Sequence, residues 1–261
     1  METFARFGYA AKGFVYGAVG ILALLAAFSV GGDTTDTTGA LHAIAEQPFG
    51  KILLALIAIG LVGYVAWQLI RAINDPRDKG TDAKGIVTRI GYFLSGLAYI
   101  GVAINAGMLA IGASNSSGGG GNSKQDWTAM VMQQPLGRWL VGIAGAITIG
   151  IGFYRLYRAY KIKFRKKLDM NELDSGKQNL LVNISRFGIA ARGVVFVMIG
   201  FFIMQAAKNF DAQQVKGLDG ALLTLTQQPF GKVLLALMAL GLMAYALYLF
   251  IEARYLKIKL R

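Results

Sequence analysis

The 261-residue chain is 55% hydrophobic and only 16% charged, whereas soluble domains carry about 25% charged residues. It has no cysteine and a single histidine, His42, which excludes disulfides, thiolate metal ligands and multi-histidine metal centres. The formal net charge of +13 does not indicate nucleic-acid binding, because the basic residues gather in alternate loops between long apolar blocks.

Each apolar block is long enough for a transmembrane helix, which needs roughly 20 apolar residues. In chain order the predicted spans are about Gly13–Val30, Gly50–Ile70, Gly91–Gly112, Leu136–Leu156, Gly188–Ala207 and Gly231–Ile251. The residues before the first block contain no cleavage motif, so we expect that block to be a span and not a removed signal peptide.

Two short signatures recur three times and divide the chain into repeats of two spans each. The first is Arg, an apolar residue and Gly at each odd span, and its arginines are Arg6, Arg89 and Arg186. The second is Gln-Pro, an apolar residue, Gly and a basic residue before each even span, and its basic residues are Lys51, Arg138 and Lys232. The sequence predicts an all-α integral membrane protein of six helices in a pseudo-threefold arrangement, with repeats at 1–73, 84–160 and 180–261.

Each loop that follows an odd span ends in a short segment with helical spacing of apolar residues, such as Leu41 and Ile44. A capping-type Asp or Thr lies just upstream. We therefore expect a short amphipathic helix at the outer surface in every repeat. The proline of the second signature (Pro48, Pro135, Pro229) is expected at the first position of the even helix.

Most of the 27 Lys and Arg residues fall in the loops on one side of the predicted spans. The positive-inside rule then predicts both termini in the cytoplasm, in the bacterial inner (plasma) membrane. Residues 161–179 form a basic cytoplasmic linker, and the segments Lys161–Leu168 and Tyr255–Arg261 are expected to bind anionic lipid at that face. Aromatic residues near the same end of the even spans are expected in an interfacial belt: Trp67, Tyr154 and Tyr248.

The run Arg6–Tyr16, its degenerate copies Arg89–Tyr99 and Arg186–Phe196, and the Gln-Pro-Phe-Gly-Lys run resemble the bacterial DUF1206 family. The resemblance covers nearly the whole chain and implies a membrane protein built from repeated two-helix units. The family has no assigned activity, so it implies no catalytic residue. The second copy departs most, because Ser95 stands where the other copies have Lys12 and Arg192.

No group of residues indicates an enzyme, a cofactor or a metal site. The predicted spans contain no histidine and no pair of acids at membrane depth, and no Walker-type phosphate-binding motif is present. Glu252 is the only carboxylate close to a span, and we expect it to pair with Arg186 or Arg254.

The candidate functional residues are basic. Lys12 and Arg192 lie deepest in the spans. Arg6, Arg89 and Arg186 on the cytoplasmic side, and Lys51, Arg138 and Lys232 on the outer side, could each form a ring of positive charge that favours anions. The alternative is that these side chains reach lipid headgroups and only anchor the helices.

Two functions are compatible with these patterns. The first is a small channel or transporter for an anionic or polar solute, indicated by the repeat-equivalent basic residues. The second is a structural or accessory membrane protein that binds lipids, a partner subunit or another copy of itself. Close glycine packing, as in Gly13–Gly17, and the polybasic edges favour the second.

Overall fold

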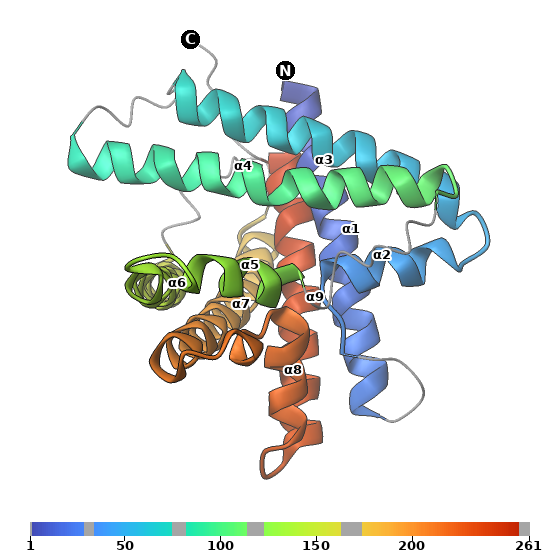
Figure 1. Ribbon diagram of the computed structural model, residues 1–261. Coiled ribbons are helices and arrows are strands. Elements are labelled where there is room, and N and C mark those ends of the chain that lie inside the picture. Colours follow the sequence, from blue (N-terminus) through green and yellow to red (C-terminus); the bar gives the residue numbers. More distant parts are fainter. Residues whose placement is uncertain (1, 29–33, 75–81, 114–122, 163–173, 256–261) are drawn as a thin grey trace.

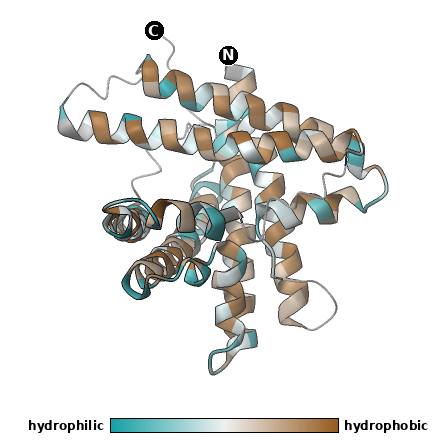
Figure 2. Cartoon of the chain, in the orientation of Figure 1, coloured by the Kyte–Doolittle hydropathy of each residue, from teal (hydrophilic) through white to brown (hydrophobic). Residues whose placement is uncertain are grey.

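The computed structural model describes residues 2–28, 34–74, 82–113, 123–162 and 174–255, and these form helices and connecting turns. The long helices are α1 (Glu2–Ala27), α3 (Gly50–Ile73), α4 (Ala83–Ala110), α6 (Gly137–Tyr160), α7 (Ser175–Asn209) and α9 (Gly231–Tyr255). All six are long and apolar enough to cross a membrane, and Figure 2 shows apolar residues along each of them. The six predicted helices are confirmed, and we treat the chain as a multi-pass membrane protein.

Several helices extend beyond the apolar blocks. The helix α7 begins at Ser175, although the block begins at Gly188, because no proline interrupts the polar residues between them. Similarly α1 begins at Glu2, which places Lys12 well inside the helix. The basic linker 161–179 and the segments Lys161–Leu168 and Tyr255–Arg261 lie largely outside the described residues.

The predicted short helices are present as α2 (Thr37–Ala45), α5 (Ser123–Met132) and α8 (Leu218–Thr226), with a 3₁₀ turn η2 (Ala212–Gln214) before α8. The side chain of Asp36 caps α2 by accepting hydrogen bonds from the amides of Thr38 (2.8 Å) and Gly39 (3.1 Å). Leu41 of α2 and Leu222 of α8 are fully buried, so one face of each short helix packs on the long helices.

The proline of the second signature does not begin the even helix, so that prediction is wrong. Pro48 occupies the second position of a turn that the Gly50 amide closes by donating to the Gln47 carbonyl (2.8 Å). Phe49, in the third position, has φ of 62°. This is a type II turn, which favours proline second and requires a positive φ third. The equivalent residues Leu136 and Phe230 have φ of 64° and 61°.

The glycine of the same signature is required by a close backbone approach. A Cβ on Gly50 would overlap the carbonyl oxygen of Ile44 at the end of α2, and Gly137 and Gly231 meet the ends of α5 and α8 in the same way. The signature therefore encodes the sharp turn between each short helix and the even helix that follows it.

The long helices pack in the spatial order α4, α3, α1, α9, α7, α6, each against the next. Figure 1 shows the antiparallel pairs α3 with α4, α1 with α9, and α6 with α7, which run in three different directions. The two ends of this series lack such close packing, because within the described residues α4 and α6 share at most marginal contact. These two helices belong to the second repeat, so that repeat is open where the first and third are closed.

Side-chain size at the helix crossing explains how the first repeat closes. A Cβ on Gly60 of α3 would lie 2.5 Å from the Cβ of Ala11 on α1, so this contact requires a glycine against an alanine. The third repeat closes in the same way, where a Cβ on Gly241 of α9 would overlap that of Ala191 on α7.

The second repeat lacks this pair of small residues. Leu94 of α4 stands at the position of Ala11, and Ile147 of α6 stands at the position of Gly60. Two bulky side chains cannot interlock as glycine and alanine do. In agreement, a Cβ on Gly91 of α4 would have no atom within 4 Å. Both cavities described next lie along this opening.

Candidate functional site

A cavity of about 490 Å³ lies where the long helices meet, and all six contribute side chains to it. The first long helices of the three repeats (α1, α4 and α7) supply Tyr9, Lys12, Tyr92, Ser95, Tyr99 and Arg192. The second long helices (α3, α6 and α9) supply Tyr64, Gln68, Arg71, Arg155, Arg158, Tyr245, Tyr248 and Glu252. On every one of these helices except α7, which supplies only Arg192 of them, these residues recur at about one-turn intervals, so one polar stripe faces inward. We call this space the basic cavity.

The basic cavity carries an excess of positive charge, because five basic side chains and one carboxylate line it: Lys12, Arg71, Arg155, Arg158, Arg192 and Glu252. Lys12, Arg71 and Arg192 are only 4%, 5% and 6% exposed. Burying charge without an opposite charge is costly, and more so at membrane depth. An anion in the cavity would offset that cost.

Tyrosines hold Lys12 in place. Its ammonium donates to the Tyr64 hydroxyl at 3.0 Å and lies 4.4 Å from the ring centre of Tyr64 and 4.2 Å from that of Tyr99. Contacts of a cation with ring faces at this distance are attractive. The Tyr64 hydroxyl also lies 3.1 Å from the Ser95 hydroxyl, so the residue that replaces a basic side chain in the second repeat belongs to the same network.

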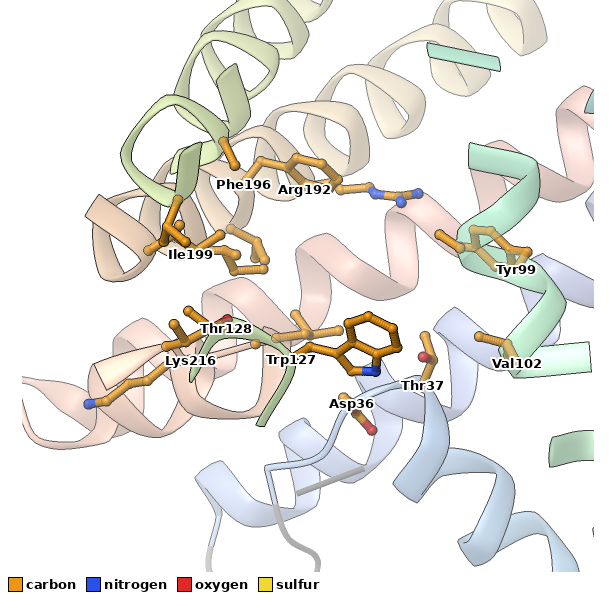
Figure 3. A pocket seen from close by; sticks show the side chains of 18 of the residues that line it. Asp36, Thr37, Tyr99, Val102, Trp127, Thr128, Arg192, Phe196, Ile199 and Lys216 are labelled. Atoms are coloured by element: carbon orange, nitrogen blue, oxygen red, sulfur yellow. The ribbon is translucent and has the colours of Figure 1, made fainter. Parts of the chain in front are cut away.

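Arg192 lines the basic cavity and is held by aromatic residues. It donates to the Tyr245 hydroxyl, and its guanidinium lies 4.6 Å from the ring centre of Tyr16 and 4.5 Å from that of Tyr245. Figure 3 shows its side chain extending from α7 toward Tyr99 on α4. Tyr99 in turn donates to the Tyr16 hydroxyl at 3.3 Å.

Among the described residues, the hydrogen-bond acceptors of Arg71 are also neutral. It donates to the Tyr9 hydroxyl at 3.2 Å and to the Gln68 side-chain oxygen at 2.9 Å, and it stacks 3.6 Å from the ring centre of Tyr92. The buried Nε–H groups of Arg71, Arg155 and Arg192 have no hydrogen-bond partner among the described residues. A molecule the size of water does not reach these Nε atoms, so an anion in the cavity would bind the terminal N–H groups of the guanidiniums, which bind carboxylate and phosphate oxygens well.

Glu252 partly balances the charge. It interacts electrostatically with Arg71 of α3 and Arg158 of α6, both of which also line the basic cavity. Its predicted pairing with Arg186 or Arg254 stays a prediction.

A second, mostly apolar cavity of about 630 Å³ adjoins the first. The two share Ala98, Tyr99, Arg192 and Phe196 as lining residues. The rest of the second wall comes from Tyr16 of α1, from α4, α6, α7 and α9, and from the short helices and the turns beside them. It includes Val102, Leu140, Ala144, Val195, Ile199 and Trp127. Figure 3 shows this space, with Lys216 directed away from it. The Lys216 amine donates to the Thr224 hydroxyl at 3.2 Å. We call this space the apolar cavity.

Of the basic residues singled out from the sequence, Lys12 and Arg192 line the basic cavity, and the others line neither cavity. Arg138 donates to the carbonyls of Ala207 and Lys208 at 2.8 Å each, at the end of α7. The macrodipole favours a cation at that position.

Arg89 and Arg6 make the same kind of contact. Arg89 donates to the carbonyls of Ala72 (2.7 Å) and Ile73 (2.8 Å) at the end of α3, and Arg6 donates to the carbonyl of Arg254 (2.8 Å) in α9. Each arginine therefore joins the start of its own helix to the end of a neighbouring one.

The remaining basic residues of the signatures have varied surroundings. Lys51 is exposed and reaches Gly112 beyond the end of α4. Arg186 is half-buried and Lys232 is exposed. Their assignment to rings of charge or to lipid headgroups stays a prediction.

Sequence reasoning missed Arg71, Arg155 and Arg158 as site residues. The sequence feature that could have identified them is their helical spacing from aromatic residues that face inward on the same helix. Trp67 and Tyr248 are 2% and 5% exposed, so their prediction as interfacial belt residues is wrong. Tyr248 lines the basic cavity instead.

The family described as Domain of Unknown Function (DUF1206) matches three segments of the chain, residues 7–75, 90–161 and 187–256. The chain is also similar to "Uncharacterized protein YxxB" of Bacillus subtilis (strain 168), with 36% identity over 255 residues that cover 98% of this chain and 91% of the relative. No solved structure matches the chain.

Proposed function

This chain belongs to the DUF1206 family, and from that premise and the basic cavity we propose that it transports an anionic solute across the membrane. The observation that carries the proposal is the excess of buried basic side chains over carboxylates where the six long helices meet. A cavity of this charge binds anions and excludes cations.

We further propose that the three repeats surround a pseudo-threefold axis, because equivalent residues line the same cavity. Lys12, Ser95 and Arg192 are equivalent in the three repeats, and all three line the basic cavity. The same holds for the set Arg71, Arg158 and Glu252, and for the set Tyr64, Ile151 and Tyr245. Equivalent residues that face one space are expected when the repeats surround a common axis, and a solute path along such an axis is the usual arrangement in a pore.

The path we propose runs through both cavities. They adjoin at the level of Tyr99 and Arg192, where the hydrogen bond from Tyr99 to Tyr16 joins α4 to α1. Under the positive-inside rule both termini are cytoplasmic, in the bacterial inner membrane. The basic cavity then faces the cytoplasmic half, and the apolar cavity faces the outer half.

Flux into liposomes tests the proposal. Purified protein is reconstituted into liposomes for wild type and for the Lys12→Ala, Arg192→Ala double variant. The uptake of chloride and of inorganic phosphate is followed, together with the movement of a fluorescent phosphatidylglycerol between the two leaflets. Wild type should transport at least one of these anions, and the double variant should lose most of that flux.

Lys177→Gln is the matched control, because Lys177 is exposed on the helix that carries Arg192 and lies outside both cavities. It should transport as wild type does. Absence of flux for all three anions, or equal flux in the double variant, would refute transport.

An accessory role is the second candidate, and one observation favours it. The helices α4 and α6 are the least buried of the long helices, so a partner subunit or a second copy could cover them. A protein that gives no anion flux but co-purifies with a stoichiometric partner would support this role in place of transport.

A further inference from the structure

We infer that the anion is amphiphilic, a phosphate-bearing headgroup with an alkyl tail, and that it reaches the cavities sideways from the bilayer between α4 and α6. The inference rests on the proposed function and specifies its substrate class.

The first observation is the contrast between two adjoining spaces. The basic cavity is lined by the guanidinium-bearing residues Arg71, Arg155 and Arg192, and the apolar cavity begins at Arg192 itself. A small hydrated anion uses only the first of these spaces. A headgroup among the arginines with a tail beyond Arg192 uses both.

The size of the apolar cavity fits one alkyl chain. A methylene group is roughly as large as a water molecule, whose share of liquid volume is about 30 Å³. The cavity of about 630 Å³ therefore has room for one chain of a membrane lipid, and a second chain would stay in the bilayer between α4 and α6. Its walls along α4 and α6, such as Val102, Leu140 and Ala144, suit a hydrocarbon tail.

The second observation is the opening of the second repeat toward the bilayer. In the first repeat, a Cβ on Gly8 of α1 would lie 2.6 Å from the Tyr64 amide nitrogen, and one on Gly63 of α3 would lie 2.8 Å from the Phe4 carbonyl oxygen. The equivalent glycines Gly91 and Gly150 have no atom within 4 Å of their Cβ positions. The interface that closes the first repeat is absent here.

Both cavities are lined by the two helices that border this gap. Ser95 and Tyr99 of α4 and Arg155 of α6 face the basic cavity, while Val102 and Ala144 face the apolar one. A lipid could therefore move its headgroup and tail into the two spaces together, and its tail would never leave an apolar environment.

Headgroup charge must then decide which lipid binds. An alkyl tail gains little by exchanging bilayer for an apolar cavity, because lipid tails are as apolar as the cavity wall. A phosphate group gains charge-assisted hydrogen bonds from the arginines. A zwitterionic headgroup also brings a cation into a cavity that is already basic. We therefore expect anionic lipid to be selected over zwitterionic lipid with the same chains.

Native mass spectrometry of protein from mixed micelles tests the inference, with dioleoylphosphatidylglycerol and dioleoylphosphatidylcholine at equal amounts. Wild type should retain phosphatidylglycerol in about tenfold preference, since repulsion between the choline cation and one basic side chain about 10 Å away is worth about that factor at an effective dielectric constant of about 20. Arg71→Gln with Arg192→Gln should abolish the preference. Calorimetric titration with inorganic phosphate, as the free anion, is run in parallel.

A variant of the apolar cavity separates the tail from the headgroup. Ala144→Trp fills the apolar cavity at an exposed position of α6 without displacing packed neighbours, and Ala146→Trp adds the same bulk on α6 outside both cavities. Ala144→Trp should lose retained lipid yet keep phosphate binding, whereas Ala146→Trp should behave as wild type. Far-ultraviolet circular dichroism confirms that each variant is folded.

The outcomes separate the two claims. Phosphate binding that depends on Arg71 and Arg192, with no lipid preference and no effect of Ala144→Trp, overturns the amphiphile and leaves anion transport standing. Lipid retained with the expected variant pattern supports the inference even where the flux experiment fails. Equal retention of both lipids in wild type and all variants overturns the inference.

Discussion

The open second repeat makes a sharp prediction about three equivalent glycines. Gly8, Gly91 and Gly188 occupy the same position of the first signature. A Cβ on Gly8 would lie 2.6 Å from the Tyr64 amide nitrogen, and one on Gly188 would overlap that of Tyr245. A Cβ on Gly91 would meet nothing within 4 Å. Alanine should therefore be harmful at two of the positions and harmless at the third.

The magnitudes follow from two opposing effects. Overpacking costs about 1–3 kcal/mol, and a contact with backbone, which cannot rotate away, should lie near the upper limit. Alanine regains about 1 kcal/mol of helix propensity over glycine. Gly8→Ala and Gly188→Ala should each lose about 2 kcal/mol of unfolding free energy, whereas Gly91→Ala should gain about 1 kcal/mol.

Thermal unfolding of the three variants in the same detergent measures this difference. At about 2–4 °C per kcal/mol for a chain of this size, Gly8→Ala and Gly188→Ala should lower the apparent Tm by about 4–8 °C. Gly91→Ala should raise it by about 2–4 °C. A fall for Gly91→Ala as large as that for Gly8→Ala would show that α4 packs closely in solution and would refute the open repeat.

Three further predictions concern single side chains. Arg138→Ala removes the hydrogen bonds to the carbonyls of Ala207 and Lys208, so it should lower the apparent Tm by about 2–4 °C, for a loss of about 1 kcal/mol at an exposed site. It should leave phosphate binding unchanged, and loss of binding would instead support a functional ring. Glu252→Gln removes the one carboxylate that lines the basic cavity among the described residues, so calorimetry should show phosphate binding tighter by about tenfold. Weaker binding would place Glu252 in the anion site as an orienting group. Asp36→Ala removes the cap of α2, at a cost of about 1 kcal/mol, and amide hydrogen exchange should quicken in α2. Unchanged exchange there would contradict the capping role.

The sequence was sufficient to predict the six long helices, because hydropathy indicates the length of each helix and the repeated signatures indicate the order of the helices. It misplaced the start of α7, since apolarity ends where lipid contact ends, while the helix continues to Ser175. It also misread Pro48, because the positive φ of Phe49 leaves no trace in the residue type. Glycine or asparagine would have signalled that turn, and phenylalanine does not.

The basic cavity could be predicted only in part. Lys12 and Arg192 stood out by their depth, whereas Arg71 and Arg158 lie near helix ends and resembled ordinary anchors. A helix that is apolar nearly all round gives no periodic signal for its inward face. The opening between α4 and α6 did have a signal, because Leu94 and Ile147 replace the small residues of the other repeats. That signal can be interpreted only once the positions of Leu94 and Ile147 are known to face each other between the two helices of a repeat.

The central claim is that the buried arginines and Lys12 hold an anion. The most direct test is an electron cryo-microscopy map of the protein in nanodiscs that contain phosphatidylglycerol. We predict density that bridges the guanidinium groups of Arg71, Arg155 and Arg192 and continues as a tail toward Ala144. An empty basic cavity with these side chains turned to the membrane surface would contradict the claim.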